Sequence, residues 1–174
     1  MFNFADLDNQ TREFMVQEIE LAKHTGNIYY SSRFNEAGSA QWIELLIEAA
    51  RTYNEHWLAY QIEARRLMKG MEGSRTPSGG YTIKHVPHTA AETMAEGQFN
   101  RFYILGLCQR AKAEGKTHVV VYRAKERAEH RPESDSLIGT RIPLDQILKE
   151  LRDVKSSLGH ALLKPNSGLS VRME

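Results

Sequence analysis

Four polar side chains of a predicted helix have a spacing that suits acid–base chemistry. They are Glu92, Glu96, Asn100 and Tyr103. Side chains three or four residues apart lie on one side of a helix, so these four form a stripe. A carboxylate beside an amide and a phenol can transfer protons, and Arg123 adds a nearby positive charge. A covered Glu96 would need a cation such as Arg101 or Arg123, whereas the alternative is a solvated or interface-facing stripe with no catalytic role.

A second group of residues has the types that bind metal ions. His85, His88 and Glu92 could together supply three ligands. However, His85 falls on a predicted strand and His88 on a turn, and no fourth ligand is evident nearby. We therefore expect no metal and no cofactor.

A basic run follows the predicted strand 119–122. It consists of Arg123, Lys125, Arg127 and Arg131. Glutamates at 126, 129 and 133 alternate with these cations, which favours an inter-subunit salt-bridge arm over a surface that tracks nucleic-acid phosphates. A solvated loop is the alternative. The net charge of +1 gives no global reason to expect nucleic acid as a partner.

The element that must position these residues is a long helix over 89–114. Thr89 and Glu92 fit a capping box at its start, and Gly115 ends it. Its second half is apolar on nearly all sides, which predicts burial between layers. Gly97 and Gly106 each cost a helix about 1 kcal/mol relative to alanine, which indicates close approach of another backbone or a helix break near Gly97.

The rest of the chain predicts an α+β fold with a helical N-terminal half and a small sheet packed on the long helix. We expect a helical region over 1–69, with helices capped by Asp6 or Asp8, by Ser39 and by Asn54. Residues 70–80 read as a flexible Gly/Ser/Pro loop, and 81–174 as an α+β region, within one compact domain. The segment 28–34 is a short strand or an extended loop. The predicted sheet joins 81–86, 119–122 and 169–172, and Pro143 starts the last helix.

Composition describes an ordinary globular chain. Of its 174 residues, 41% are hydrophobic and 26% are charged. No apolar run has the ~20 residues of a membrane span, and the first residues do not resemble a signal peptide. The single cysteine, Cys108, lies on an apolar helix face and fits a buried hydrophobe. We expect a soluble protein of the virion or the host cytoplasm.

Four segments, 95–103, 121–125, 131–139 and 165–172, resemble a group of small uncharacterised proteins of tailed-phage and prophage structural gene blocks. The resemblance covers about the C-terminal half and transfers no catalytic residue. It implies a role in the virion or its assembly. The hypothesis is a structural interaction protein, a phage head component that self-associates or binds a capsid partner. The alternatives are a small enzyme, perhaps one that processes nucleic acid through Glu96, Asn100, Tyr103 and Arg123, and a nucleic-acid-binding module.

Overall fold

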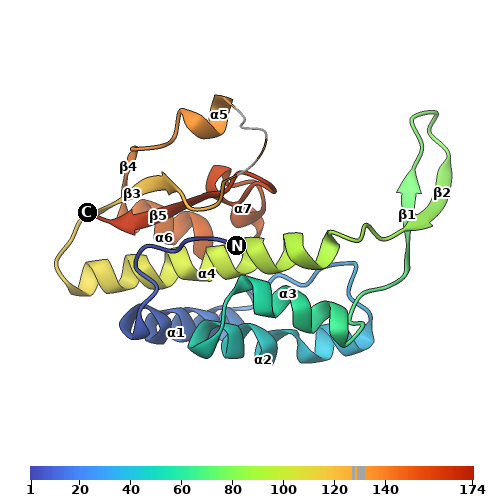
Figure 1. Cartoon of the computed structure of the whole chain (residues 1–174), viewed down its shortest axis with the longest axis horizontal. Helices are drawn as coiled ribbons and strands as arrows, with labels where there is room; N and C mark the ends of the chain where they lie inside the picture. Colours follow the sequence, from blue (N-terminus) through green and yellow to red (C-terminus); the bar gives the residue numbers. More distant parts are fainter. Residues whose placement is uncertain (127, 129–131) are drawn as a thin grey trace.

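The computed structural model describes residues 1–126, 128 and 132–174. It confirms the α+β class: a long helix, α4 (Ala90–Ala113), lies between a layer of helices and a small antiparallel sheet (Figure 1). The helical layer is formed by α1 (Asn9–Thr25), α2 (Glu36–Thr52) and α3 (Glu55–Ala64). No helix in the described part of the chain is long and apolar enough to cross a membrane.

The three N-terminal helices begin at side chains that accept backbone N–H groups. Asp8 and Asn54 cap α1 and α3, as predicted. The predicted cap at Ser39 is wrong: α2 begins earlier, where Asn35 accepts the N–H of Gly38 at 2.9 Å. The side chain of Asn35, one turn upstream, thus serves as the N-cap that was expected at Ser39.

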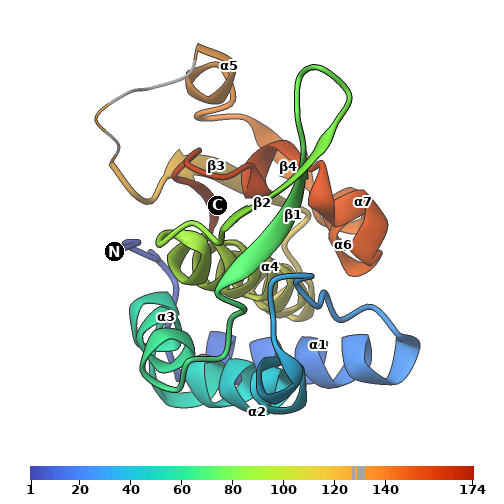
Figure 2. The same ribbon diagram turned by 90° about the vertical axis from the view of Figure 1, so that its right-hand side faces the viewer.

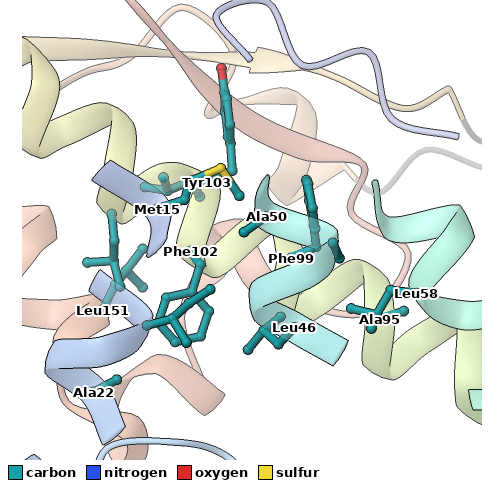
Figure 3. Close-up of a cluster of buried hydrophobic side chains, with 14 of the residues drawn as sticks. Met15, Ala22, Leu46, Ala50, Leu58, Ala95, Phe99, Phe102, Tyr103 and Leu151 are labelled. Carbon is teal, nitrogen blue, oxygen red and sulfur yellow. The ribbon is translucent and has the colours of Figure 1, made fainter. Parts of the chain in front are cut away.

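Helix α4 is the buried spine of the protein, as its sequence predicts. Its aromatic side chains Phe99, Phe102 and Tyr103 lie in one hydrophobic cluster with aliphatic side chains of α1, α2 and α6 (Figure 3). A Cβ added at Gly106 would lie 2.6 Å from the backbone nitrogen of Met15, so this glycine is where α1 approaches. The predicted capping box is wrong, because Thr89 makes no side-chain cap and Glu92 contacts Lys125 instead.

The sheet that covers α4 has the strand order β4-β3-β5. Its strands are β3 (His118–Arg123), β4 (Arg141–Pro143) and β5 (Leu169–Met173). The predicted pairing of 119–122 with 169–172 is confirmed, with Val121 opposite Val171. The segment 81–86 does not join this sheet; β4 takes its place beside β3. The segment 28–34 forms no strand, only a single bridge between Phe34 and Met68.

Part of the predicted loop 70–80 is instead a strand. β1 (Met71–Arg75) pairs with β2 (Tyr81–His85) in an antiparallel hairpin, closed by a turn in which Thr76 Oγ1 accepts the Gly80 N–H at 2.9 Å. The hairpin, here called the arm (71–85), projects from the body beyond the start of α4 (Figures 1 and 2). It forms a two-stranded sheet separate from the one on α4.

The C-terminal part consists of short elements. They are α5 (Pro132–Asp135), α6 (Leu144–Arg152), α7 (Val154–Leu158) and η1 (Ala161–Leu163). Of these, α6 and η1 pack on α4. Pro143 is the last residue of β4 and precedes α6 rather than starting it. The polar segment 123–136, whose basic run was expected to form an inter-subunit salt-bridge arm or a solvated loop, contains α5 among its described residues.

Candidate functional site

The predicted polar stripe on α4 lies under the C-terminal strand. Asn100, 2% exposed, donates from Nδ2 to the Leu169 carbonyl at 2.9 Å and accepts from Ser170 Oγ at 2.7 Å. The amide thereby satisfies a backbone group and a hydroxyl of β5 that burial would otherwise leave unpaired. Asn100 therefore links β5 to α4, and both polar atoms of its amide already have hydrogen-bond partners.

Glu96 and Glu92 share one cation, Lys125. The Lys125 ammonium donates to Glu92 Oε1 at 3.0 Å and to Glu96 Oε1. The side chains of Lys125 and Glu96 are each 12% exposed. The cation predicted for Glu96 was Arg101 or Arg123, and the structure supplies Lys125 because it follows β3 directly above α4. Opposite charges held this close, away from water, neutralise one another.

Arg123 is engaged inside the chain as well. Its Nη1 donates to the Ser167 carbonyl at 2.9 Å, and its Nη2 contacts the Asp135 carboxylate. The guanidinium thus ties α5 and the turn before β5 to the end of β3. Of the predicted partner-binding cations, Arg123 and Lys125 make internal contacts. Arg127 and Arg131 lie outside the described residues.

Tyr103 is sealed beneath the N-terminal segment. Its hydroxyl accepts the Asp6 N–H at 3.2 Å, and the Phe4 ring lies 4.5 Å from its ring centre. Burial raises the pKa of Tyr103, so the phenol remains protonated at neutral pH. Tyr122 strengthens this cover, since its hydroxyl accepts the Ala5 N–H at 2.9 Å. No substrate reaches Tyr103 in this arrangement.

The space beside the stripe is small. The pocket next to Glu96 and Asn100 has a volume of about 40 Å³ and is bordered by Phe2 and the turn 165–168. One water needs roughly 10–15 Å³ of such space, so the pocket has room for a few water molecules and nothing larger. The polar atoms of Glu96, Asn100, Tyr103 and Arg123 are thus paired within the chain. The pocket that borders Glu96 and Asn100 is too small for a substrate.

Described residues of the four segments 95–103, 121–125, 131–139 and 165–172 contact one another in this cluster. Glu96 of the first contacts Lys125 of the second, Arg123 contacts Asp135 of the third, and Asn100 contacts Ser170 of the fourth. These contacts join α4, the sheet and α5, and the residues that make them are together called the polar lock.

Sequence reasoning missed the role of Arg101. This side chain is fully buried and donates to the carbonyls of Leu151 at 2.8 Å, Asn27 at 3.0 Å and Arg152 at 3.1 Å. Two of these carbonyls end α6, where the helix dipole favours a cation. Burial lowers the pKa of Arg101 to about 10, which still leaves it charged at neutral pH. The signal was an arginine within the apolar half of a helix.

The weak metal candidates are not brought together. His85 is exposed on the arm, His88 lies in the turn before α4, and Glu92 contacts Lys125. Among the residues that the structure describes, no three histidine, cysteine or carboxylate side chains are placed to hold a metal ion.

The arm carries a different kind of surface. Its pairing register places Met71, Tyr81 and Ile83 on one face, because alternate residues of a strand point the same way. Their exposed fractions are 43%, 75% and 66%. This set is called the arm patch below. On the opposite face, Arg33 makes a two-pronged contact with Glu72, at 2.7 and 3.0 Å, which fixes the base of the arm to the body.

These features define a small α+β protein in which the polar side chains on α4 are paired internally, whereas the apolar side chains of the arm are exposed to solvent. No family model, curated protein or solved structure matches the chain.

Proposed function

We propose that this chain is a structural interaction protein that self-associates, with the arm as its contact element. The observation that carries the proposal is the arm patch: two of the three most exposed large hydrophobic side chains among the described residues lie on one projecting hairpin. Scattered exposed hydrophobic side chains are ordinary, but a contiguous apolar face on a projecting element is typical of an interaction site.

The limited stability of an isolated hairpin supports this proposal. A two-stranded hairpin alone is marginally stable in water, and a third strand or a packed surface is needed to hold it. Every residue of β2 is exposed, so the body supplies little of that support beyond Arg33 and the base of the arm. A partner on the apolar face would supply the rest.

The enzyme alternative lacks comparable support. Catalysis needs a reacting group with room for a substrate beside it. Glu96 contacts Lys125, Asn100 contacts Ser170 and Leu169, and the adjoining pocket of about 40 Å³ has room for a few water molecules only. The nucleic-acid alternative relied on the basic run, of which Arg123 and Lys125 are used internally.

Sedimentation velocity tests self-association directly. The full chain should sediment as a dimer or larger species at micromolar concentration. A variant in which 72–84 is replaced by a short Gly-Ser turn should be a folded monomer, since the pair of Met71 with His85 leaves the cut ends adjacent. A full chain that stays monomeric up to the highest soluble concentration contradicts the proposal.

A virion location is the finer part of the proposal, and it depends on the resemblance of the four segments. Mass spectrometry of particles purified from a culture that carries the gene tests it. The proposal expects the chain in fixed ratio to the major shell protein. Its absence from purified particles contradicts the virion assignment and leaves self-association untouched.

A further inference from the structure

A pocket of about 300 Å³ lies between α1 and α6 and reaches the middle of α4; it is called the α1–α6 pocket. Small-molecule sites in proteins have volumes of roughly 300 Å³ and more, so the pocket is large enough for a small ligand. Its lining contains three cations and two carboxylates, which gives one net positive charge. They are Arg101, Lys149, Arg152, Glu18 and Asp153. None of the lining residues belongs to the arm or to the polar lock.

Arg152 keeps one edge of its guanidinium available to a ligand. Its Nε and Nη2 donate to the two carboxylate oxygens of Glu18, at 3.0 and 2.7 Å. Glu18 is buried, so this two-pronged contact fixes the position of Arg152, whose own side chain is partly exposed. The edge formed by Nη1 and Nη2 has the fork of N–H groups that fits a second carboxylate, and Nη1 has no partner among the described residues.

Lys149 is the second cation that an anion in the pocket would meet. It lies three residues before Arg152 on α6, so the two side chains share one side of the helix. Lys149 is exposed, and within the described ranges its ammonium has no ion pair or hydrogen bond. The two carboxylates of the lining are already engaged, because Glu18 holds Arg152 and Asp153 accepts the Ser156 N–H at 2.7 Å.

Arg101 adds a positive charge that no carboxylate contacts. Its hydrogen bonds in the described part of the chain go to three backbone carbonyls. The side chain is fully buried against the pocket, so it acts on a ligand through its charge and not through direct contact. Attraction between opposite charges is stronger in such an environment than in water, and a bound anion would offset part of the cost of burying this charge.

The remaining lining includes an apolar strip formed by Leu21, Ala22 and Leu105. Leu21 is 41% exposed, so it has surface left for a ligand to cover. We propose that the α1–α6 pocket binds a small organic monocarboxylate, with the carboxylate between Lys149 and the free edge of Arg152 and the apolar body on Leu21. One negative charge balances the net charge of the lining. This ligand site goes beyond the proposed self-association and does not depend on it.

Titration of the isotope-labelled full chain, followed by its amide resonances, tests the inference. The probes are benzoate and hexanoate, and benzamide is the uncharged control with the shape of benzoate. At least one carboxylate should bind saturably, with a Kd of about 1 mM or below, and should shift amides of 18–27 and 149–153 more than the others. Benzamide should not shift them at the same concentration. Equal shifts with benzamide, or no saturable shift with either carboxylate, overturn the inference.

Substitution of Lys149 locates the site. Lys149→Gln should weaken carboxylate binding by about tenfold, because a charge-assisted contact is lost, and Lys149→Arg should retain most of the affinity. Lys23→Gln is the matched control, since it removes an exposed cation of α1 that does not line the pocket, and it should leave the affinity unchanged. Equal losses for Lys149→Gln and Lys23→Gln would show attraction to overall charge and overturn the site. Sedimentation of the unliganded chain reports on self-association separately, so either proposal can fail without the other.

Discussion

Helix α4, the spine, and the arm differ most in how far their side chains are buried. Helix α4 is buried along most of its length, and its polar residues such as Asn100 and Arg101 are paired with backbone groups. The arm has the reverse character: β2 is exposed throughout, and the apolar side chains Tyr81 and Ile83 face outward. Stability is therefore concentrated around α4, whereas the arm offers a surface for contact. Substitutions should therefore separate the two regions by which measurement they change.

The largest effect is expected at the contact between α4 and α1. Gly106→Ala places a Cβ 2.6 Å from the Met15 backbone nitrogen, so the two helices must separate. We expect the free energy of unfolding in urea to fall by about 3 kcal/mol, the upper end for overpacking. Gly97→Ala is the matched control on the same helix, with nothing within 4 Å of its new Cβ. It should gain up to about 1 kcal/mol, and equal losses at both sites would refute α4 as a tightly packed spine.

The next effect is expected in the polar lock. Asn100→Asp removes the N–H group that binds the Leu169 carbonyl and places a charge in a buried site. Urea unfolding at neutral pH should show a loss of roughly 2–3 kcal/mol, and Ser170→Ala a loss of about 1 kcal/mol. The Asp variant should recover part of its deficit as the pH falls toward about 4, where the carboxyl takes a proton. A deficit independent of pH would show that the charge is not buried.

Glu55, the first residue of α3, makes the stability of the fold depend on pH. Burial raises the pKa of Glu55, although the Phe2 N–H, 2.6 Å from Oε1, acts against this. Its Oε2 atom is buried and has no hydrogen-bond partner among the described residues. The folded state therefore favours the protonated form, and its contribution, present below the unfolded pKa near 4.5, is lost as the pH rises through the raised pKa.

Glu55→Gln should accordingly raise the free energy of unfolding at about pH 8 by on the order of 1 kcal/mol, and the melting temperature should rise with it. At about pH 4 the gain should be much smaller. Thermal unfolding followed by circular dichroism across this range measures the difference. The exposed Glu13→Gln is the control and should give a flat difference. A gain for Glu55→Gln that does not change with pH contradicts the assigned cause.

The smallest effect on stability, and the largest on association, is expected on the arm. Ile83→Ser should change the free energy of unfolding of the body by less than about 0.5 kcal/mol, as for an ordinary surface site. It should weaken the dimer by about tenfold or more in sedimentation equilibrium, since about 1.4 kcal/mol of apolar burial is lost. Thr82→Ser, on the opposite face of the same strand, should change neither measurement. A dimer that ignores Ile83→Ser would remove the arm patch from the interface.

The sequence predicts the spine well because its signals are local. The apolar run of α4 and the terminating Gly115 follow from periodicity and turn residues. The pairing of β3 with β5 was also predicted, although strand composition alone does not specify it. β1 was missed because Met-Glu-Gly-Ser-Arg has little strand propensity, and it forms a strand only as the partner of β2. The alternation of β2 indicates a strand but does not say which strand it pairs with, so it was placed in the wrong sheet.

In the candidate site, too, local spacing was predicted correctly and long-range contacts were not. Helical spacing placed Glu96 and Asn100 on one face correctly, but their partners come from distant parts of the chain. The pairing with Lys125 and with Ser170 depends on how the sheet docks on α4, which periodicity does not specify. The exposure of the arm patch likewise depends on a hairpin that the sequence presents as a loop.

Amide hydrogen exchange as a function of protein concentration tests the central claim most directly, because it reports on both regions in one experiment. The account predicts that amides of α4 are protected at every concentration. Amides of 71–85 should exchange quickly in dilute protein and become protected over the concentration range in which the dimer forms. Arm protection that is already complete in the monomer, or that stays absent in the concentrated protein, would contradict it.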